Sequence, residues 1–563
     1  LGKTIVTPIE YDGFGRQARE YLPFPIGSAA NTVVSPTING NSFYSTLTGD
    51  TTPFSEKTFE NSPLNRVIAQ AAPGNSWKKG AHEIRFGYDT NVDGEVYKFG
   101  VDNPTTNPTL TLNSTYQKGV LYKTVTTDEN GQPIEEFKDK EGRVVLKRIH
   151  IESKTVAPLN SSGNHDTYYV YDIYGNLTFV LPPQLINTDY GNINSYRNNL
   201  AELGYQYFYD EKNRLVEKQL PGKGREFMVY DNQDRLTLQQ DINQRTAVEK
   251  GWTFFKYDKF GRMVYSGFFK NTATRGSMQT ALNNKKTANN EERVPTVFAN
   301  NGQSIYYTNA QFPNGSLIVQ SVNYYDHYQN LGVTPSSIDN QNVIGADDTK
   351  TKGLAVASYI NVLGETTWNK SYTYYDAKYI RPIASHLDNY LGGYQTTASI
   401  LDFRGKVKNT VTKHKPTDIG TEILIQEEFD YYPNELLKYQ THQINNNPKE
   451  YIVQNSYNEI NQLTSKKVGN SVASNPLQTV DYKYNIRGWM TDINNIDITE
   501  IGNNRDLFSF RLNYDKITRL NWDPAKFKPL HNGNISETIW KTDKDNTIRS
   551  YNYQYDGLNR LIE

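Results

Sequence analysis

The residues of this chain that could act as acids, bases or metal ligands stand in adjacent pairs. Asp347-Asp348 and Glu291-Glu292 each lie in a polar stretch without a histidine or a third carboxylate at ligand spacing. We interpret both as solvated loop charge. The histidine pairs His165-Asp166 and Asp326-His327 lack an identifiable nucleophile, and no two of the eight histidines are spaced i, i+4. These residues predict no acid/base or metal chemistry.

Other chemical classes are excluded by composition. The chain has no cysteine, which excludes disulfides, thiolate metal sites and cysteine nucleophiles. The glycine-rich pieces 221–225 and 391–393 lack phosphate-loop spacing and are interpreted as turns. The net charge of −1 gives no indication of a basic surface that would bind nucleic acid. No apolar run is long enough to cross a membrane as a helix. We expect no catalytic residue, no cofactor and no metal ion in this chain.

One charged pattern does recur. Tyr-Asp is followed by two or three turn-forming residues, an arginine and an apolar pair, with tandem copies starting at Tyr209, Tyr230 and Tyr257. Repetition at this period indicates a repeat architecture. The motif residues are Tyr11, Asp12, Gly15, Arg16, Tyr171, Asp172, Gly175, Tyr209, Asp210, Arg214, Tyr230, Asp231, Arg235, Tyr257, Asp258, Gly261, Arg262, Tyr555, Asp556 and Arg560.

The motif aspartates and arginines allow more than one interpretation. Recurring Asp and Gly turns resemble calcium-binding sequences, but no 12-residue loop with a terminal glutamate occurs, so we favour an aspartate that caps its own turn. The arginines could form a ladder that holds an acidic or unfolded cargo. We favour pairing of each arginine with the aspartate of its own or a neighbouring unit.

The elements that carry the motif are predicted to be β-hairpins. Residues 205–209 alternate before the Tyr-Asp turn, and residues 214–218 alternate after it. Because one hairpin is marginal alone, successive hairpins must pair edge to edge into a long sheet. The fold class is therefore all-β. Hydrophobic content is only 36%, which favours a hollow shell over a dense globule, and 42 tyrosines against 23 phenylalanines suit a sheet with a wet face.

The Tyr-Asp-x-x-Gly/Asn-Arg-Leu unit resembles the Rhs/YD repeat of bacterial polymorphic toxins, toxin-complex proteins and teneurins. The resemblance implies a strip of antiparallel hairpins that spirals into a hollow shell, with a few short helices in insertions. It covers essentially the whole chain, because weaker copies occur near residues 137, 325, 375, 401, 432, 457 and 484.

Two regions resemble the Rhs-type proteins of Bacteroidetes in particular. They are residues 53–77 with 88–97, and the blocks 485–490, 506–510 and 532–542. We expect an N-terminal module over 1–120 that starts within a repeat, and a repeat shell over 121–563 with insertions at about 270–320 and 335–353. The C-terminal core and effector of that family are expected outside residues 1–563.

Local signals predict a few departures from the hairpin pattern. Residues 26–52 are interpreted as an exposed loop anchored at Phe43-Tyr44, and 62–72 as a short helix with Ser62 as its N-cap. A second short helix is expected over 194–204, capped by Asn194 and ended by Gly204, and residues 280–293 are expected to be partly helical.

The resemblance implies a mechanical function. We expect the shell segment of a secreted or cell-surface protein that encloses and delivers a C-terminal toxin or effector in interbacterial competition and is not an enzyme. Expected partners are the enclosed effector, the type IX secretion machinery and an immunity protein, with no nucleic acid and no membrane insertion. One alternative is an adhesin that binds glycans through surface aromatics. Another is a carbohydrate-active enzyme, which would need two carboxylates in a cleft.

Overall fold

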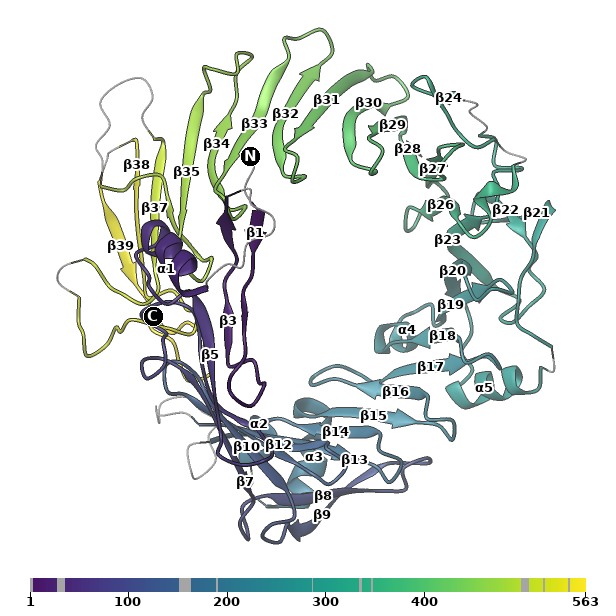
Figure 1. Ribbon diagram of the computed structural model, residues 1–563. Coiled ribbons are helices and arrows are strands. Elements are labelled where there is room, and N and C mark those ends of the chain that lie inside the picture. Colours follow the sequence, from purple (N-terminus) through teal and green to yellow (C-terminus); the bar gives the residue numbers. More distant parts are fainter. Residues whose placement is uncertain are drawn as a thin grey trace.

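The central feature of the computed structural model is one antiparallel sheet of 31 strands that curls into a closed ring (Figure 1). The structure describes residues 4–27, 36–150, 164–188, 191–285, 287–333, 337–345, 348–497, 506–519, 522–544 and 547–563. Strands pair in chain order from β2 to β39, so the polypeptide follows the sheet around the ring. The expected all-β strip of hairpins is confirmed.

The strands of the first part of the main sheet are β2 (Ile9–Glu10), β3 (Arg19–Tyr21), β5 (Phe54–Phe59), β6 (Val67–Ala71), β7 (Ile84–Thr90), β10 (Tyr122–Thr127), β11 (Pro133–Lys138), β12 (Val144–His150), β13 (Asn164–Tyr171), β14 (Leu177–Leu181), β15 (Tyr205–Tyr209), β16 (Leu215–Gln219), β17 (Glu226–Tyr230), β18 (Leu236–Gln240), β19 (Trp252–Tyr257) and β20 (Met263–Phe269). Those of the second part are β23 (Leu317–Tyr325), β26 (Ala355–Asn361), β27 (Trp368–Tyr375), β28 (Pro382–Asp388), β29 (Gly392–Leu401), β30 (Val407–Thr417), β31 (Ile423–Tyr431), β32 (Leu437–Ile444), β33 (Glu450–Tyr457), β34 (Leu463–Val468), β35 (Gln478–Tyr484), β36 (Met490–Ile493), β37 (Phe508–Asn513), β38 (Glu537–Thr542) and β39 (Arg549–Asn552).

Short elements lie beside this sheet. Two-stranded pairs are formed by β1 (Thr4–Val6) with β4 (Phe24–Ile26), β8 (Tyr97–Asp102) with β9 (Thr109–Thr115), β21 (Arg293–Asn300) with β22 (Gln303–Tyr307), and β24 (Ser337–Ile338) with β25 (Gln341–Asn342). The helices are α1 (Pro36–Leu47), α2 (Pro183–Thr188), α3 (Ile193–Leu203), α4 (Ile242–Thr246), α5 (Arg275–Asn283) and the 3₁₀ turn η1 (Thr349–Thr351).

Insertions supply the hydrophobic cores, because they cover one face of the sheet. The expected insertion at 270–320 forms α5 and the β21–β22 pair, which lie outside the ring in Figure 1. Met278 of α5 and Ile305 of β22 pack with Trp252 and Phe254 of β19 in one buried cluster. A second cluster joins α2, α3, β8 and β9 to strands β11–β14. Each insertion therefore makes a two-layer patch on a strip that is otherwise one layer thick.

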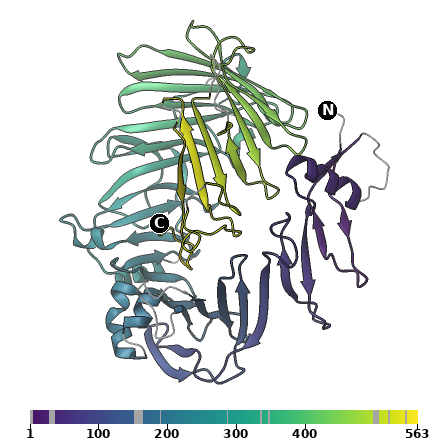
Figure 2. The same cartoon turned by 90° about the vertical axis from the view of Figure 1, so that its left-hand side faces the viewer.

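The strip from β30 to β36 is such a single layer. Most of its residues are half-buried on both faces, and its strands carry many Thr, Gln, Lys and Glu side chains. Figure 2 shows these green strands as one long curved wall. A wall wet on both faces needs few apolar residues, which accounts for the low hydrophobic content of the chain.

Two local predictions are wrong. Residues 62–72 are not a helix: Asn65 has φ 52° in a turn between β5 and β6, and the β-branched pair Val67-Ile68 enters a strand. Within residues 26–52, Pro36–Leu47 form the helix α1 and not a loop, and residues 28–35 lie outside the described residues. The expected aromatic anchor is present, because Tyr44 is buried and its hydroxyl donates to Pro23 O at 2.7 Å. Contacts with Phe24 outweigh the weak helix propensity of that segment.

Other local predictions stand with small changes. The helix expected at 194–204 is α3, which ends at Gly204 and is capped by Asn192 rather than Asn194. Among the described residues of the segment 280–293, only the first four are helical, because α5 ends at Asn283. The boundary expected at residue 120, between the N-terminal module and the repeat shell, stays a prediction. The main sheet continues across it, because β7 pairs directly with β10. No helix in the described ranges is long and apolar enough to cross a membrane.

Candidate functional site

The aspartate of each repeat organises its own turn. In the unit at 230–235, Asp231 Oδ1 accepts from the backbone N–H groups of Gln233 and Arg235 at 2.9 and 3.0 Å, while Oδ2 accepts from Arg235 Nε at 2.9 Å. Asp234 takes a left-handed conformation with φ 58°. Gly, Asn or Asp recur at this position because they tolerate positive φ. The strand register shifts at Tyr230, so this turn carries a β-bulge.

The same geometry recurs around the ring. The Nε–Oδ2 hydrogen bond measures 2.6–2.9 Å in the pairs Arg16–Asp12, Arg143–Asp139, Arg214–Asp210, Arg235–Asp231, Arg262–Asp258 and Arg560–Asp556. In the unit at 171–176, Asn176 replaces the arginine and donates to Asp172 at 3.1 Å, and Gly175 has φ 86°. Gly15 and Gly261 take the same left-handed conformation, with φ 74° and 79°.

The repeat tyrosine joins each unit to the one before it. Tyr257 Oη donates to the carbonyl of Leu236 at 2.7 Å, and Tyr230 Oη donates to the carbonyl of Leu215 at 2.8 Å. Both acceptors directly follow the arginine of the preceding unit. Tyr171 and Tyr209 make the same contact with Val144 and Leu177, at 3.2 and 3.1 Å.

The arginine completes this contact between units. The guanidinium of Arg214 lies 5.2 Å from the ring centroid of Tyr230, and that of Arg262 lies 4.5 Å from Tyr325. Arg262 also makes two hydrogen bonds to Asp326, at 2.8 and 2.7 Å. We call this set of aspartate cap, arginine and following tyrosine the repeat interlock. At the N-terminal end Phe59 takes the tyrosine's place against Arg16, at 4.3 Å, and Tyr11 is exposed.

The hydrogen bonds of the interlock favour ionised carboxylates. The backbone N–H and side chain of Arg16 hold the pKa of Asp12 below its usual value. In a unit that sequence reasoning missed, Glu60 stands where other units have aspartate. Its bonds to the Arg66 side chain and to Ser62 lower the pKa of Glu60 to about 2.

Two of the units that depart from the pattern follow one another along the chain. Asn458 and Asn485 stand in place of the aspartate, and Gln462 and Trp489 in place of the arginine. Their turn residues Ile460 and Ile486 pack against Phe24 and Tyr44 of the N-terminal segment. Burying an ion pair is costly, so neutral residues suit turns that another segment covers.

These turns lie where the two ends of the ring meet. Trp77, which is 2% exposed, packs edge-on against Trp489 with ring centroids 5.7 Å apart. Trp77 Nε1 donates to the carbonyl of His531 at 2.7 Å, and Ser76 Oγ donates to Asp515 Oδ2 at 2.6 Å. Arg487 lies 5.5 Å from the ring of Trp77 and 4.9 Å from that of Trp489. We call this contact between residues 74–82 and residues 485–489, 514–519 and 522–534 the ring seam.

The sequence analysis does not predict the ring seam. The blocks that contain Trp77, Trp489 and Asn532 show a family resemblance, but nothing in them indicates that they contact one another. The replacement of aspartate by Asn458 and Asn485, next to Ile460 and Ile486, is the signal that could have identified the seam, because it removes charge from two adjacent turns.

One of the candidate carboxylate pairs was misjudged. Glu291 is not solvated: it is 1% exposed and lies 2.8 Å from Lys256 Nζ, which is equally buried. Thr308 Oγ1 and the N–H of Gln311 also donate to Glu291, at 2.5 and 3.0 Å. The pair anchors the 270–320 insertion to β19. Asp347 lies outside the described residues, and Asp348 caps η1.

The histidine–aspartate pairs hold structural positions. Asp166 is fully buried and makes two hydrogen bonds with Arg148, at 2.7 and 2.8 Å. Asp326 is engaged by Arg262 in the repeat interlock. In the described part of the chain, no group of three or more His, Cys, Asp or Glu side chains is placed to hold a metal ion.

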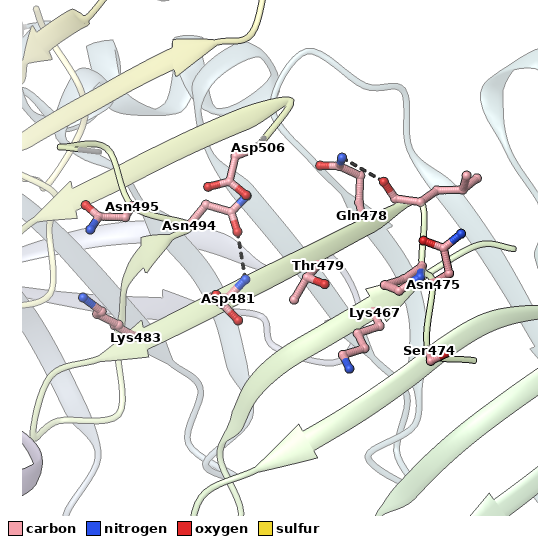
Figure 3. A pocket seen from close by; sticks show the side chains of 12 residues that line it. Lys467, Ser474, Asn475, Gln478, Thr479, Asp481, Lys483, Asn494, Asn495 and Asp506 are labelled. Atoms are coloured by element: carbon pink, nitrogen blue, oxygen red, sulfur yellow. Dashed lines mark hydrogen bonds between the residues drawn. The ribbon is translucent and has the colours of Figure 1, made fainter. Parts of the chain in front are cut away.

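A polar pocket of about 470 Å³ opens beside β34 and β35 (Figure 3). Lys467 and Lys483 supply ammonium groups to its lining, and Asp481 and Asp506 supply carboxylates. Asn494 is structural, because it accepts from the N–H of Asp481 and donates to the carbonyl of Phe508, both at 2.8 Å. The pocket could hold a small polar ligand, and it lines no part of the ring seam.

Comparison with solved structures identifies the fold. The crystal structure of TcdB2-TccC3 matches with a TM-score of 0.58 and 13% sequence identity, over 100% of this chain and 22% of that one. The fold is that of a YD-repeat shell strip. The structure of TcdB2-TccC3 without its hypervariable C-terminal region matches with a TM-score of 0.56 and 14% identity, over 98% of this chain and 21% of that one. The structure of the Photorhabdus luminescens Tc holotoxin pore matches with a TM-score of 0.57 and 13% identity, over 98% of this chain and 21% of that one.

The remaining comparisons are narrower. This chain spans about a fifth of the length of the solved chains that it matches. A family model described as a domain of unknown function, DUF6443, matches residues 1–90, which include Trp77 of the ring seam. No curated protein matches the sequence significantly.

Proposed function

We propose that this chain is the shell segment of an exported YD-repeat protein. The shell encloses a polypeptide effector and does not itself catalyse a reaction. The observation that carries the proposal is the ring. Thirty-one strands curl until Trp77 meets Trp489, and the repeat interlock joins successive hairpins in the regular units. The sheet ends at the edge strands β2 and β39, and side chains of the ring seam bring its two ends together, so such a wall can isolate an unfolded or toxic chain.

The finer points of the proposal rest on the resemblance. The effector would belong to the same polypeptide outside residues 1–563, and an immunity protein would protect the producing cell. The protein would come from the Bacteroidetes and be secreted or held at the cell surface after export by the type IX machinery.

Cryo-EM of the full-length protein, combined with protease digestion, tests the proposal. We expect density inside the ring and a protected C-terminal fragment. Trp77→Ala and Trp489→Ala should expose that fragment by opening the ring seam. Trp368→Ala is the matched control. Trp368 is 7% exposed and its indole donates to Asn301 O, and its strand β27 lies on the opposite side of the ring from β36 in Figure 1. A ring filled by its own side chains, or a fragment digested equally in all variants, would refute the proposal.

The absence of catalysis has its own test. Asp481 and Asp506 line the pocket of Figure 3 and are the carboxylates that a carbohydrate-active enzyme would use there. We expect Asp481→Asn with Asp506→Asn to leave the effects of the full-length protein on target cells unchanged. Hydrolysis of a glycan panel that this double variant loses would establish the enzyme instead.

An adhesin is the second candidate, and the turn tips favour it. Phe14, Phe260 and Phe403 are 85%, 68% and 86% exposed at the turns of their units. An arginine lies about 5 Å from each ring, at 5.0, 4.9 and 5.2 Å. Saturable glycan or cell binding that is lost in the triple alanine variant would support this function over the container.

A further inference from the structure

Two histidines stack on each other across the ring seam. The rings of His82 and His531 have centroids 3.3 Å apart and are nearly parallel, at 9°. His82 comes from the segment before β7 and is exposed, whereas His531 comes from the segment before β38 and is 7% exposed. Each ring therefore belongs to one side of the joint, and the stack bridges it.

Backbone contacts hold both rings in place. His82 Nδ1 lies 2.9 Å from the carbonyl of Ser76. The carbonyl of His531 accepts from Trp77 Nε1 at 2.7 Å, and its N–H donates to Asn130 Oδ1 at 2.8 Å. His531 is thus the residue through which the C-terminal side meets two separate N-terminal loops, and its backbone cannot move away without breaking these hydrogen bonds.

Charges of both signs surround this stack. The neighbouring charged groups are His82, Asp128, Glu129, Arg487 and Asp515, and Lys78, Lys79 and Lys528 lie on the same segments. Asp515 favours a protonated His531 ring, but burial and the neighbouring His82 outweigh it, and Asp128 contacts Asn532 instead. Arg487 carries a permanent positive charge against Trp77 and Trp489.

We propose that the His82–His531 stack makes the ring seam an acid-sensitive joint, closed at neutral pH and opened when both imidazoles are protonated. Two imidazolium rings in parallel contact repel each other, and one of them would also carry its charge into a buried site. The proposal concerns the joint itself and does not depend on what the ring encloses.

The direction of the pH dependence follows from His531. Burial and, second, the neighbouring His82 lower the pKa of His531 from 6.5 to about 4. The neutral ring is therefore the form that fits the closed joint. Its contribution to closure is complete above the ordinary histidine pKa and is lost as the pH falls from 6.5 toward 4.

A pair of spin labels across the seam tests this on the full-length protein. Lys79→Cys and Lys528→Cys place one exposed label on each side, and residues 1–563 contain no native cysteine; any cysteine elsewhere in the full-length protein is replaced by serine. We expect a single short distance at about pH 7.5 and a longer, broader population that becomes the majority by about pH 4. Labels at Lys413→Cys and Lys449→Cys, in the wall away from the seam, should report one unchanged distance.

Variants then assign the response. His531→Phe keeps a buried aromatic ring and should abolish the change with pH, and His82→Gln, at an exposed site, should shift the transition to lower pH. His442→Phe, in the wall strand β32, should leave it unchanged. A seam distance that is constant from about pH 7.5 to 4, or a transition that His531→Phe retains in full, would overturn the proposal.

Discussion

The guanidinium carbon of Arg235 lies 4.8 Å from the ring centroid of Tyr257, one repeat further along the chain. The hydroxyl of that tyrosine returns a hydrogen bond to the carbonyl that follows Arg235. Arg235 also binds Asp231 in its own turn, and its Nη1 donates to the carbonyl of Asp258 in the next turn at 3.0 Å. One side chain therefore stabilises a turn and the junction between two units.

Removing the tyrosine hydroxyl should weaken one junction. Tyr257→Phe leaves the carbonyl of Leu236 without its side-chain donor but keeps the ring under Arg235. We expect a loss of about 0.5–1.5 kcal/mol of unfolding free energy by urea titration. Tyr122→Phe, at a tyrosine that is 64% exposed, is the control and should change stability by less. Equal effects of the two variants would argue against the junction.

The aspartate–arginine pair should be strongly coupled because it is shielded from water. The side chains of Arg235 and Asp231 are 13% and 1% exposed. A double-mutant cycle with Asp231→Asn and Arg235→Gln should give a coupling energy of about 1–3 kcal/mol. The exposed pair Arg404 and Glu435, at 44% and 42%, should give less than about 1 kcal/mol in the same cycle. Similar coupling in both pairs would contradict this prediction.

The buried Lys256–Glu291 pair should be intolerant of losing one partner. Glu291→Gln leaves the Lys256 ammonium buried without its counter-charge and should cost about 3–5 kcal/mol of stability. Glu292→Gln, at the exposed neighbouring residue, should change stability by less than about 0.5 kcal/mol. Hydrogen exchange should report the loss first in β19 and in the β21–β22 pair. A loss of stability no larger than that of Glu292→Gln would contradict this prediction and would indicate that the Glu291 carboxylate is solvated.

Glu60 should stabilise its turn only while it is ionised. Because Arg66 and Ser62 lower its pKa from 4.5 to about 2, its contribution is present above 4.5 and is lost as the pH falls toward 2. The difference in melting temperature between the wild type and Glu60→Gln should therefore be largest at neutral pH and vanish near pH 2. Glu202→Gln, on the exposed side of α3, should show no such convergence. A pH-independent difference for Glu60→Gln would contradict the ionic contribution.

Prediction from sequence succeeded where the physics is local. A turn needs an aspartate cap and a residue that tolerates positive φ, so Asp231 and Asp234 are recognisable from the chain alone. It failed where distant contacts outweighed local preference. Ser62-Pro63 resembled a helix start but lies in a hairpin turn, and α1 forms although its propensity is weak, because Tyr44 packs on Phe24.

The sequence by itself determined the repeating hairpin, the pairing of aspartate with arginine and the strip that the units build, because each depends on residues a few positions apart. The tertiary structure alone decided where the strip meets itself. Trp77 and Trp489, and His82 and His531, are hundreds of residues apart, and only the accumulated curvature of the sheet brings them together. The burial of Glu291 was likewise decided by the insertion folding back onto β19, since the same Glu291-Glu292 pair in an open loop would be solvated.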